Sequence, residues 1–66
     1  MFEYLMLKTI IKNIETNITK ECDILKKNEN YLELVIVGTT IKLKLIKKNN
    51  CYIGKYKNME FISTGN

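Results

Sequence analysis

Four runs of alternating apolar and polar residues fill the second half of the chain, at residues 31–37, 40–47, 51–57 and 59–63. Strict alternation is typical of half-buried β-strands. The runs are separated by Gly38-Thr39, Asn49-Asn50 and Lys57-Asn58, and two-residue loops containing Gly or Asn favour hairpins. Lys57 is an unfavourable first residue for such a turn. The pattern predicts a four-stranded antiparallel meander.

The turns also predict how the strands are paired. A type II′ turn at the first loop places leucine opposite leucine and Glu33 opposite Lys44, while a type I′ turn at the second places Ile46 opposite Ile53. The last turn places Ile53 opposite Ile62. A slip of one residue would move every leucine to the other face, so the pairing should be firmly held. The predicted core face consists of Leu32, Leu34, Ile36, Ile41, Leu43, Leu45, Tyr52, Tyr56, Met59 and Phe61.

The first half of the chain shows a different periodicity. Residues 2–22 are predicted to form an amphipathic helix, although Thr, Asn and β-branched residues lower its intrinsic propensity. Alternatively, residues 21–26 form an extra strand, with 27–30 as its turn. A helix packed on the meander gives a single small α+β domain over residues 1–66. Residues 63–66 at its end are predicted to form a loose tail. The helical spacing is carried by Leu7, Ile10, Ile11, Ile14 and Ile18, with Lys8, Lys12, Glu15 and Lys20 on the other side.

The outer face of the sheet is predicted to carry three rows of side chains. Because a solvated sheet face is normally polar, a row of three isoleucines and a tyrosine indicates an interface, unless residues after Lys20 fold over it. The second row consists of Glu33, Lys44, Lys55 and Glu60. The third places Lys42 opposite Lys57 without an acid between them, which favours an acidic or phosphate partner. The predicted partner-binding residues are Tyr31, Ile46, Ile53, Ile62, Lys42, Lys44, Lys55 and Lys57.

Self-association is predicted because a domain of 66 residues has a marginal core. The dimer would be held by the isoleucines of the outer face or by the apolar start of the chain. In the alternative, the N-terminus wraps under the sheet edge or frays. The dimer candidates at the start of the chain are Phe2, Tyr4, Leu5 and Met6.

Catalytic chemistry is not predicted. The chain contains no His to act as an acid or base near neutral pH, and Cys22 and Cys51 alone cannot complete a tetrahedral metal site. No carboxylate pair, nucleophile–base pair or phosphate-binding glycine loop is evident. We therefore expect no enzymatic activity, metal, cofactor or small-molecule substrate. No apolar run is long enough to span a bilayer and none resembles a secretory signal, so a cytoplasmic location is expected.

The formal charge of +4 permits an anionic partner. Usage skewed to Lys, Asn and Ile is typical of AT-rich genomes, including those of many phages. The predicted function is a non-catalytic protein-binding module, a phage or mobile-element product that occludes a host protein or protein–nucleic-acid complex. An inhibitor of a defence system such as a CRISPR nuclease (an anti-CRISPR protein) is one example. The alternatives are a lysine-driven nucleic-acid-binding protein and a homodimeric structural component.

Overall fold

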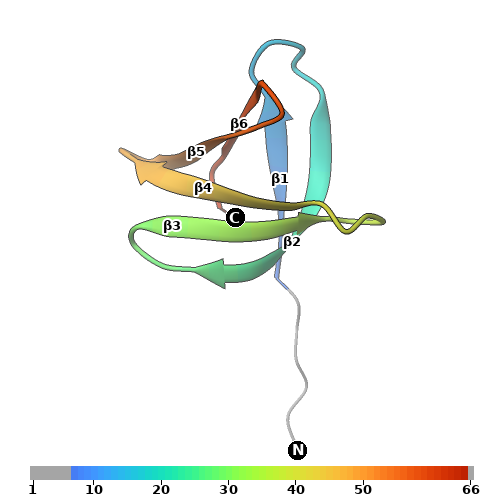
Figure 1. Ribbon diagram of the computed structural model, residues 1–66. Helices are drawn as coiled ribbons and strands as arrows, with labels where there is room; N and C mark the ends of the chain where they lie inside the picture. Colours follow the sequence, from blue (N-terminus) through green and yellow to red (C-terminus); the bar gives the residue numbers. More distant parts are fainter. Residues whose placement is uncertain (1–6, 66) are drawn as a thin grey trace, which may run out of the picture.

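The computed structural model describes residues 7–65, and these form an all-β structure (Figure 1). Each strand pairs antiparallel with the next, and the last pairs with the first, which closes a six-stranded barrel. The predicted α+β fold is therefore wrong, because most of the predicted helix 2–22 is strand and turn. The strands are β1 (Lys8–Asn13), β2 (Thr19–Lys27), β3 (Tyr31–Ile36), β4 (Lys42–Lys48), β5 (Cys51–Tyr56) and β6 (Met59–Ser63).

The predicted meander is confirmed in β3 to β6. The four strands begin and end within two residues of their predicted bounds. Tyr31 pairs with Ile46, Ile46 with Ile53, and Ile53 with Ile62, as the turns predicted. Glu33 likewise lies opposite Lys44. Six of the ten predicted core residues are buried, three pack against them at partial exposure, and Met59 is exposed.

The turns reach this register with different geometries from those predicted. Thr39 donates its N–H to the Ile36 carbonyl, so Gly38, with φ 83°, is the third residue of the turn, as in type II rather than type II′. In the second turn only Asn49 has a positive φ, whereas type I′ requires two. Lys57 and Asn58 both have positive φ and do match type I′.

Burial in β1 explains why no helix forms there. Ile10 and Ile11 would lie on one face of a helix, but neighbouring strand residues point to opposite sides. In the structure Ile11 is fully buried and Ile10 is 50% exposed. A meander of four strands would leave unpaired backbone groups along β3 and β6, and β1 and β2 pair with both edges. Barrel closure satisfies these groups, which a helix on one face could not do.

The loop between β1 and β2 contains local turn chemistry. The Asn13 side-chain oxygen accepts hydrogen bonds from the N–H groups of Glu15 and Thr16. Asn17 has a φ of 62° and donates its N–H to the Asn13 carbonyl. Asn tolerates both roles better than most residues. These residues turn the chain in the middle of the predicted helix.

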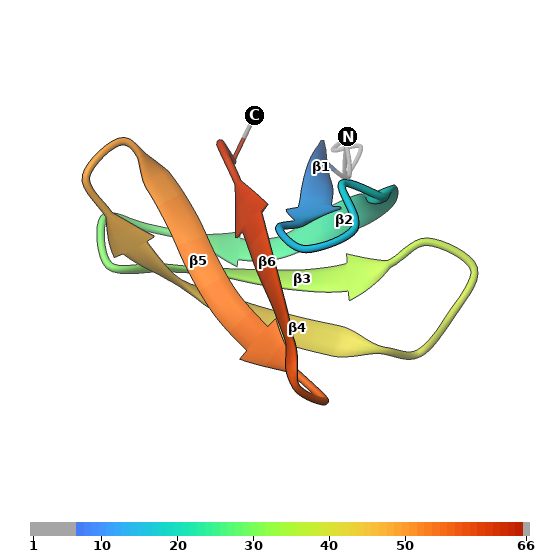
Figure 2. The same ribbon diagram turned by 90° about the horizontal axis from the view of Figure 1, so that it is seen from above.

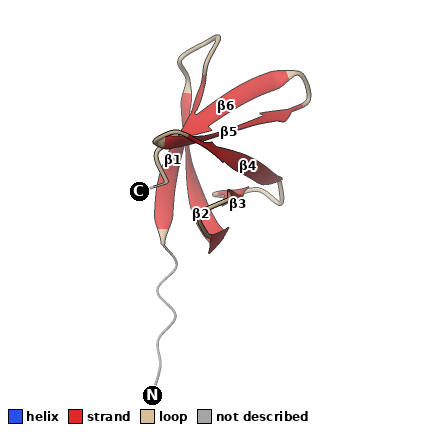
Figure 3. Ribbon diagram, turned by 90° about the vertical axis from the view of Figure 1, so that its left-hand side faces the viewer, coloured by secondary structure: helices blue, strands red, loops and turns tan. Residues whose placement is uncertain are grey.

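Two features of the strands shape the barrel. β2 pairs with β1 through its first half and with β3 through its second (Figure 2). Its register with β3 shifts at Leu25, as expected for a β-bulge. The β4–β5 ladder ends at the Ile46–Ile53 pair, after which the two strands spread apart (Figure 3). Gly54 lies at this point, where an added Cβ would be 2.7 Å from the Lys44 carbonyl oxygen. Glycine thus permits the close approach of β5 to β4.

The C-terminal residues cover the end of the barrel that lies opposite the place where β4 and β5 spread apart. Gly65 is buried against the Tyr52 ring with a φ of 82°, and its carbonyl accepts a hydrogen bond from Lys27 Nζ at 2.9 Å. Ser63 is also buried and lies 3.0 Å from the Thr9 hydroxyl. The prediction of a loose tail from residue 63 is wrong for residues 63–65. The buried apolar side chains inside the barrel are Ile11, Cys22, Leu32, Leu34, Leu43, Leu45, Tyr52 and Phe61.

Candidate protein interface

An apolar row crosses four neighbouring strands on the outside of the barrel. Its members, Tyr31, Ile46, Ile53 and Ile62, are direct cross-strand partners, and we call them the isoleucine row. Ile46 is 50% exposed and the other three are half-buried. The segment after Lys20 forms β2 instead of folding over the row. Within residues 7–65 the row therefore remains on the surface.

The row extends onto β1, which sequence reasoning missed. Ile62 pairs with Lys12, and Ile10, two residues earlier, is also exposed. Ile10 and Ile62 line a shallow hollow of about 370 Å³ together with Cys51. The missed signal is the run of β-branched residues at 9–11, which favours a strand over a helix.

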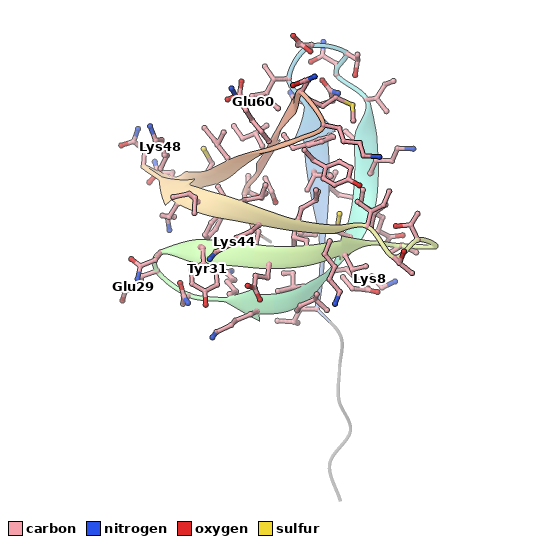
Figure 4. The ribbon with its side chains drawn as sticks, in the orientation of Figure 1. Lys8, Glu29, Tyr31, Lys44, Lys48 and Glu60 are labelled. Atoms are coloured by element: carbon pink, nitrogen blue, oxygen red, sulfur yellow. The ribbon has the colours of Figure 1, made fainter. Side chains whose placement is uncertain are left out.

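Tyr31 lies between two lysines at one end of the row. Lys44 Nζ lies 4.4 Å from the centre of the Tyr31 ring (Figure 4). Lys26 Nζ lies 5.7 Å from the same ring, so both lysines are within reach of a cation–π interaction. Hydrogen bonding to Tyr31 also raises the pKa of Lys26. Lys26 was not predicted as a site residue, because the predicted sheet covered residues 31–63 alone.

Other predicted site residues are not brought together. Lys42 does not lie opposite Lys57, because β5 has left β4 before this position and Lys57 lies in the β5–β6 turn. Lys57 Nζ instead lies 5.6 Å from the Tyr56 ring. Lys55 does pair with Glu60 across the strands. Among the described residues, however, the only ion pair joins Lys8 and Asp23, at 3.7 Å.

The proposed dimer contact at Phe2, Tyr4, Leu5 and Met6 lies outside the described residues. The described part of the chain contains no group of three or more His, Cys, Asp or Glu side chains placed to hold a metal ion. Within residues 7–65 there is also no helix long and apolar enough to span a membrane.

The two thiols lie in different environments. Cys22 is fully buried in the core, whereas Cys51 is half-buried and donates a hydrogen bond to the Lys48 carbonyl at 3.5 Å. Burial, followed by the charges of Asp23 and Glu21, raises the pKa of the Cys22 thiol from 9.0 to about 11. A thiol with this pKa is almost entirely protonated at neutral pH and is not an activated nucleophile.

Because the pKa of Cys22 is raised, the free energy of unfolding depends on pH in the alkaline range. Between pH 9 and 11 the unfolded chain loses the Cys22 proton while the folded chain keeps it, so the free energy of unfolding must fall as the pH rises. The loss should reach about 2–3 kcal/mol at pH 11, since one pKa unit corresponds to about 1.4 kcal/mol. Urea unfolding at several pH values measures it. Cys51→Ser should keep this fall and Cys22→Ala should reduce it; an equal fall in both variants would contradict the assignment.

No protein-family model, curated protein or solved structure matches this chain.

Proposed function

We propose that this protein is a non-catalytic binding module that covers a surface of a partner protein with its isoleucine row. The observation that carries the proposal is a continuous line of apolar side chains, paired strand to strand, on the outside of a closed barrel. Contiguous apolar patches of this kind typically mark interaction sites.

The fold does not need this row for its core. The interior is filled by residues from all six strands, and these side chains point away from the outer surface. Ile46 is half exposed although it lies in the middle of a regular strand, where a polar residue would serve equally well. A binding role accounts for an apolar residue at this position. The compositional inference of a phage product places a bacterial defence protein among the candidate partners.

Two matched variants test the proposal. Ile46→Asp places a charge in the row, and Ile14→Asp places the same charge at a residue of similar exposure, 43%, in the β1–β2 loop. Affinity capture from a bacterial lysate treated with nuclease, followed by mass spectrometry, compares both with the unmodified chain. We expect the unmodified chain and Ile14→Asp to recover the same protein, and Ile46→Asp to lose it. Equal recovery by all three would contradict the proposal.

Nucleic-acid binding is the second candidate, and Tyr31 between Lys26 and Lys44 is the observation that favours it. An aromatic ring flanked by cations can stack on a base and contact phosphates. Tyr52 and Phe61 disfavour a stacking platform because they are buried, and Tyr56 packs against the core at partial exposure. Titration of a labelled oligonucleotide at two salt concentrations separates the candidates. Binding that weakens steeply with salt and is lost in Lys44→Glu would favour nucleic acid.

Self-association through the same row is the third candidate. Two copies of the chain carry the same row, so the two rows can pack against each other in a symmetric interface. Sedimentation equilibrium of the unmodified chain and of Ile46→Asp tests it: a dimer that Ile46→Asp dissociates would assign the row to a homodimer.

A further inference from the structure

A second apolar surface lies at the end of the barrel where β4 and β5 spread apart. A hollow of about 310 Å³ opens there between the β1–β2 loop, the adjoining ends of β3 and β4, and the β5–β6 turn. It exists because the β4–β5 ladder ends at Ile46–Ile53 and leaves the core open at this end. Its apolar lining consists of Ile18, Ile36, Ile41, Tyr56, Met59 and Phe61.

Few polar side chains line this hollow, and part of their hydrogen-bond acceptor capacity is already used. The Asn13 side-chain oxygen already accepts two N–H groups, and the Thr16 hydroxyl accepts the N–H of Ile18. Among residues 7–65, Lys20 is the only charged residue that lines the hollow, and no carboxylate of these residues lines it. Lys57 lies close by, with its Nζ 5.6 Å from the ring of the lining residue Tyr56. The lining therefore suits an apolar body with one negative charge at its edge.

The volume limits the size of the ligand. It lies at the lower end of the range of about 300–1,000 Å³ for small-molecule sites, and mouths of β-barrels are common places for them. A hollow at the lower end of this range suits one medium-length alkyl chain rather than a two-chain lipid.

We propose that this hollow binds a monomeric anionic amphiphile, a medium-chain carboxylate whose alkyl chain lies against Ile36, Ile41 and Phe61 and whose head group meets Lys20. The hollow lies at the end of the barrel formed by the β1–β2, β3–β4 and β5–β6 connections, whereas the isoleucine row lies on the barrel's side. This proposal is therefore independent of the proposed function, and each can fail without the other.

Sodium decanoate, kept below its micelle concentration, is the probe. Titration into the ¹⁵N-labelled protein should give saturable shifts of the amide signals of Ile18, Ile36 and Met59, with little change at Ile46 or Ile53. Decanol, which has the same chain without the charge, should bind at the same place about two- to fivefold more weakly, as expected for loss of one exposed ion pair.

Three variants test where decanoate binds and whether Lys20 meets its head group. Ile18→Asp places a carboxylate in the lining of the hollow at a loop residue that is 56% exposed, so the fold should persist, and it should weaken decanoate binding at least tenfold. Ile14→Asp, with the same charge outside the lining, should bind as the unmodified chain does within a factor of two. Lys20→Gln should bind decanoate as weakly as decanol. No saturable shift, equal loss in both aspartate variants, or binding to anionic vesicles without binding to decanoate would each overturn the proposal.

Discussion

Replacement of Gly54 by alanine should lower the free energy of unfolding by about 2–3 kcal/mol, the upper part of the range for overpacked sites. An added Cβ would lie 2.6 Å from Leu45 Cδ2 and 2.7 Å from the Lys44 carbonyl oxygen. A side chain can rotate away, but the carbonyl belongs to the backbone of β4. A domain of this size has a total stability of about 3–10 kcal/mol, so this loss is a large fraction of it. Urea unfolding followed by circular dichroism measures the change.

Lys55→Ala is the matched control for this experiment. Lys55 follows Gly54 in β5 and is exposed, so its truncation should change stability by about 0.5 kcal/mol or less. If the two variants were equally stable, β5 would not approach β4 as closely as the structure shows.

Truncation of Ile11 should have the second large effect, a loss of about 2–5 kcal/mol in Ile11→Ala, the range for a buried aliphatic side chain. Ile11 is fully buried inside the barrel, whereas its neighbour Ile10 is 50% exposed on the outside. Ile10→Ala should therefore cost much less, about 1 kcal/mol or below.

The contrast between these two variants separates the strand from the predicted helix. In a helix packed on the sheet, both isoleucines would lie in the apolar stripe and both truncations would be costly. Comparable losses of stability in Ile10→Ala and Ile11→Ala, measured by urea unfolding, would contradict the assignment of β1.

The second half of the fold could be predicted because its information is local. Each turn sequence joins two strands of strict alternation, and one register satisfies all three hairpins at once. The prediction survives the different turn geometries because each loop keeps the predicted centre, and a loop that is lengthened equally on both sides gives the same pairs. Thus the Gly38 turn is type II rather than II′, but Leu34 still lies opposite Leu43.

The first half could not be predicted in the same way because its apolar spacing is ambiguous. Leu7, Ile10, Ile14 and Ile18 fit a helical stripe, yet all four are exposed in the barrel. The decisive information is non-local: β1 and β2 are selected by the unpaired edges of β3 and β6. The local evidence for strands was the β-branched content and Asn17, which favours a turn.

The two candidate surfaces differ in the same way: one could be predicted from local sequence and the other could not. The isoleucine row follows from pairing within β3 to β6 and was predicted residue by residue. The hollow depends on Ile18 and Lys20, which the helix prediction placed elsewhere, and on the early end of the β4–β5 ladder at Gly54. The pairing of Lys42 with Lys57 failed for this last reason, since continuous pairing of β4 and β5 was assumed.

Barrel closure by β1 and β6 is the central claim, since the hollow and the extension of the isoleucine row onto β1 depend on it. Ile14 donates its N–H to the Glu60 carbonyl at 2.9 Å, which makes the adjacent Asn13–Phe61 pair the close, non-hydrogen-bonded type, with Cα atoms about 4.5 Å apart. A nuclear Overhauser spectrum should therefore show a strong contact between the Hα protons of Asn13 and Phe61. Its absence, together with helical contacts between residues three apart over residues 7–20, would contradict the barrel and restore the helix.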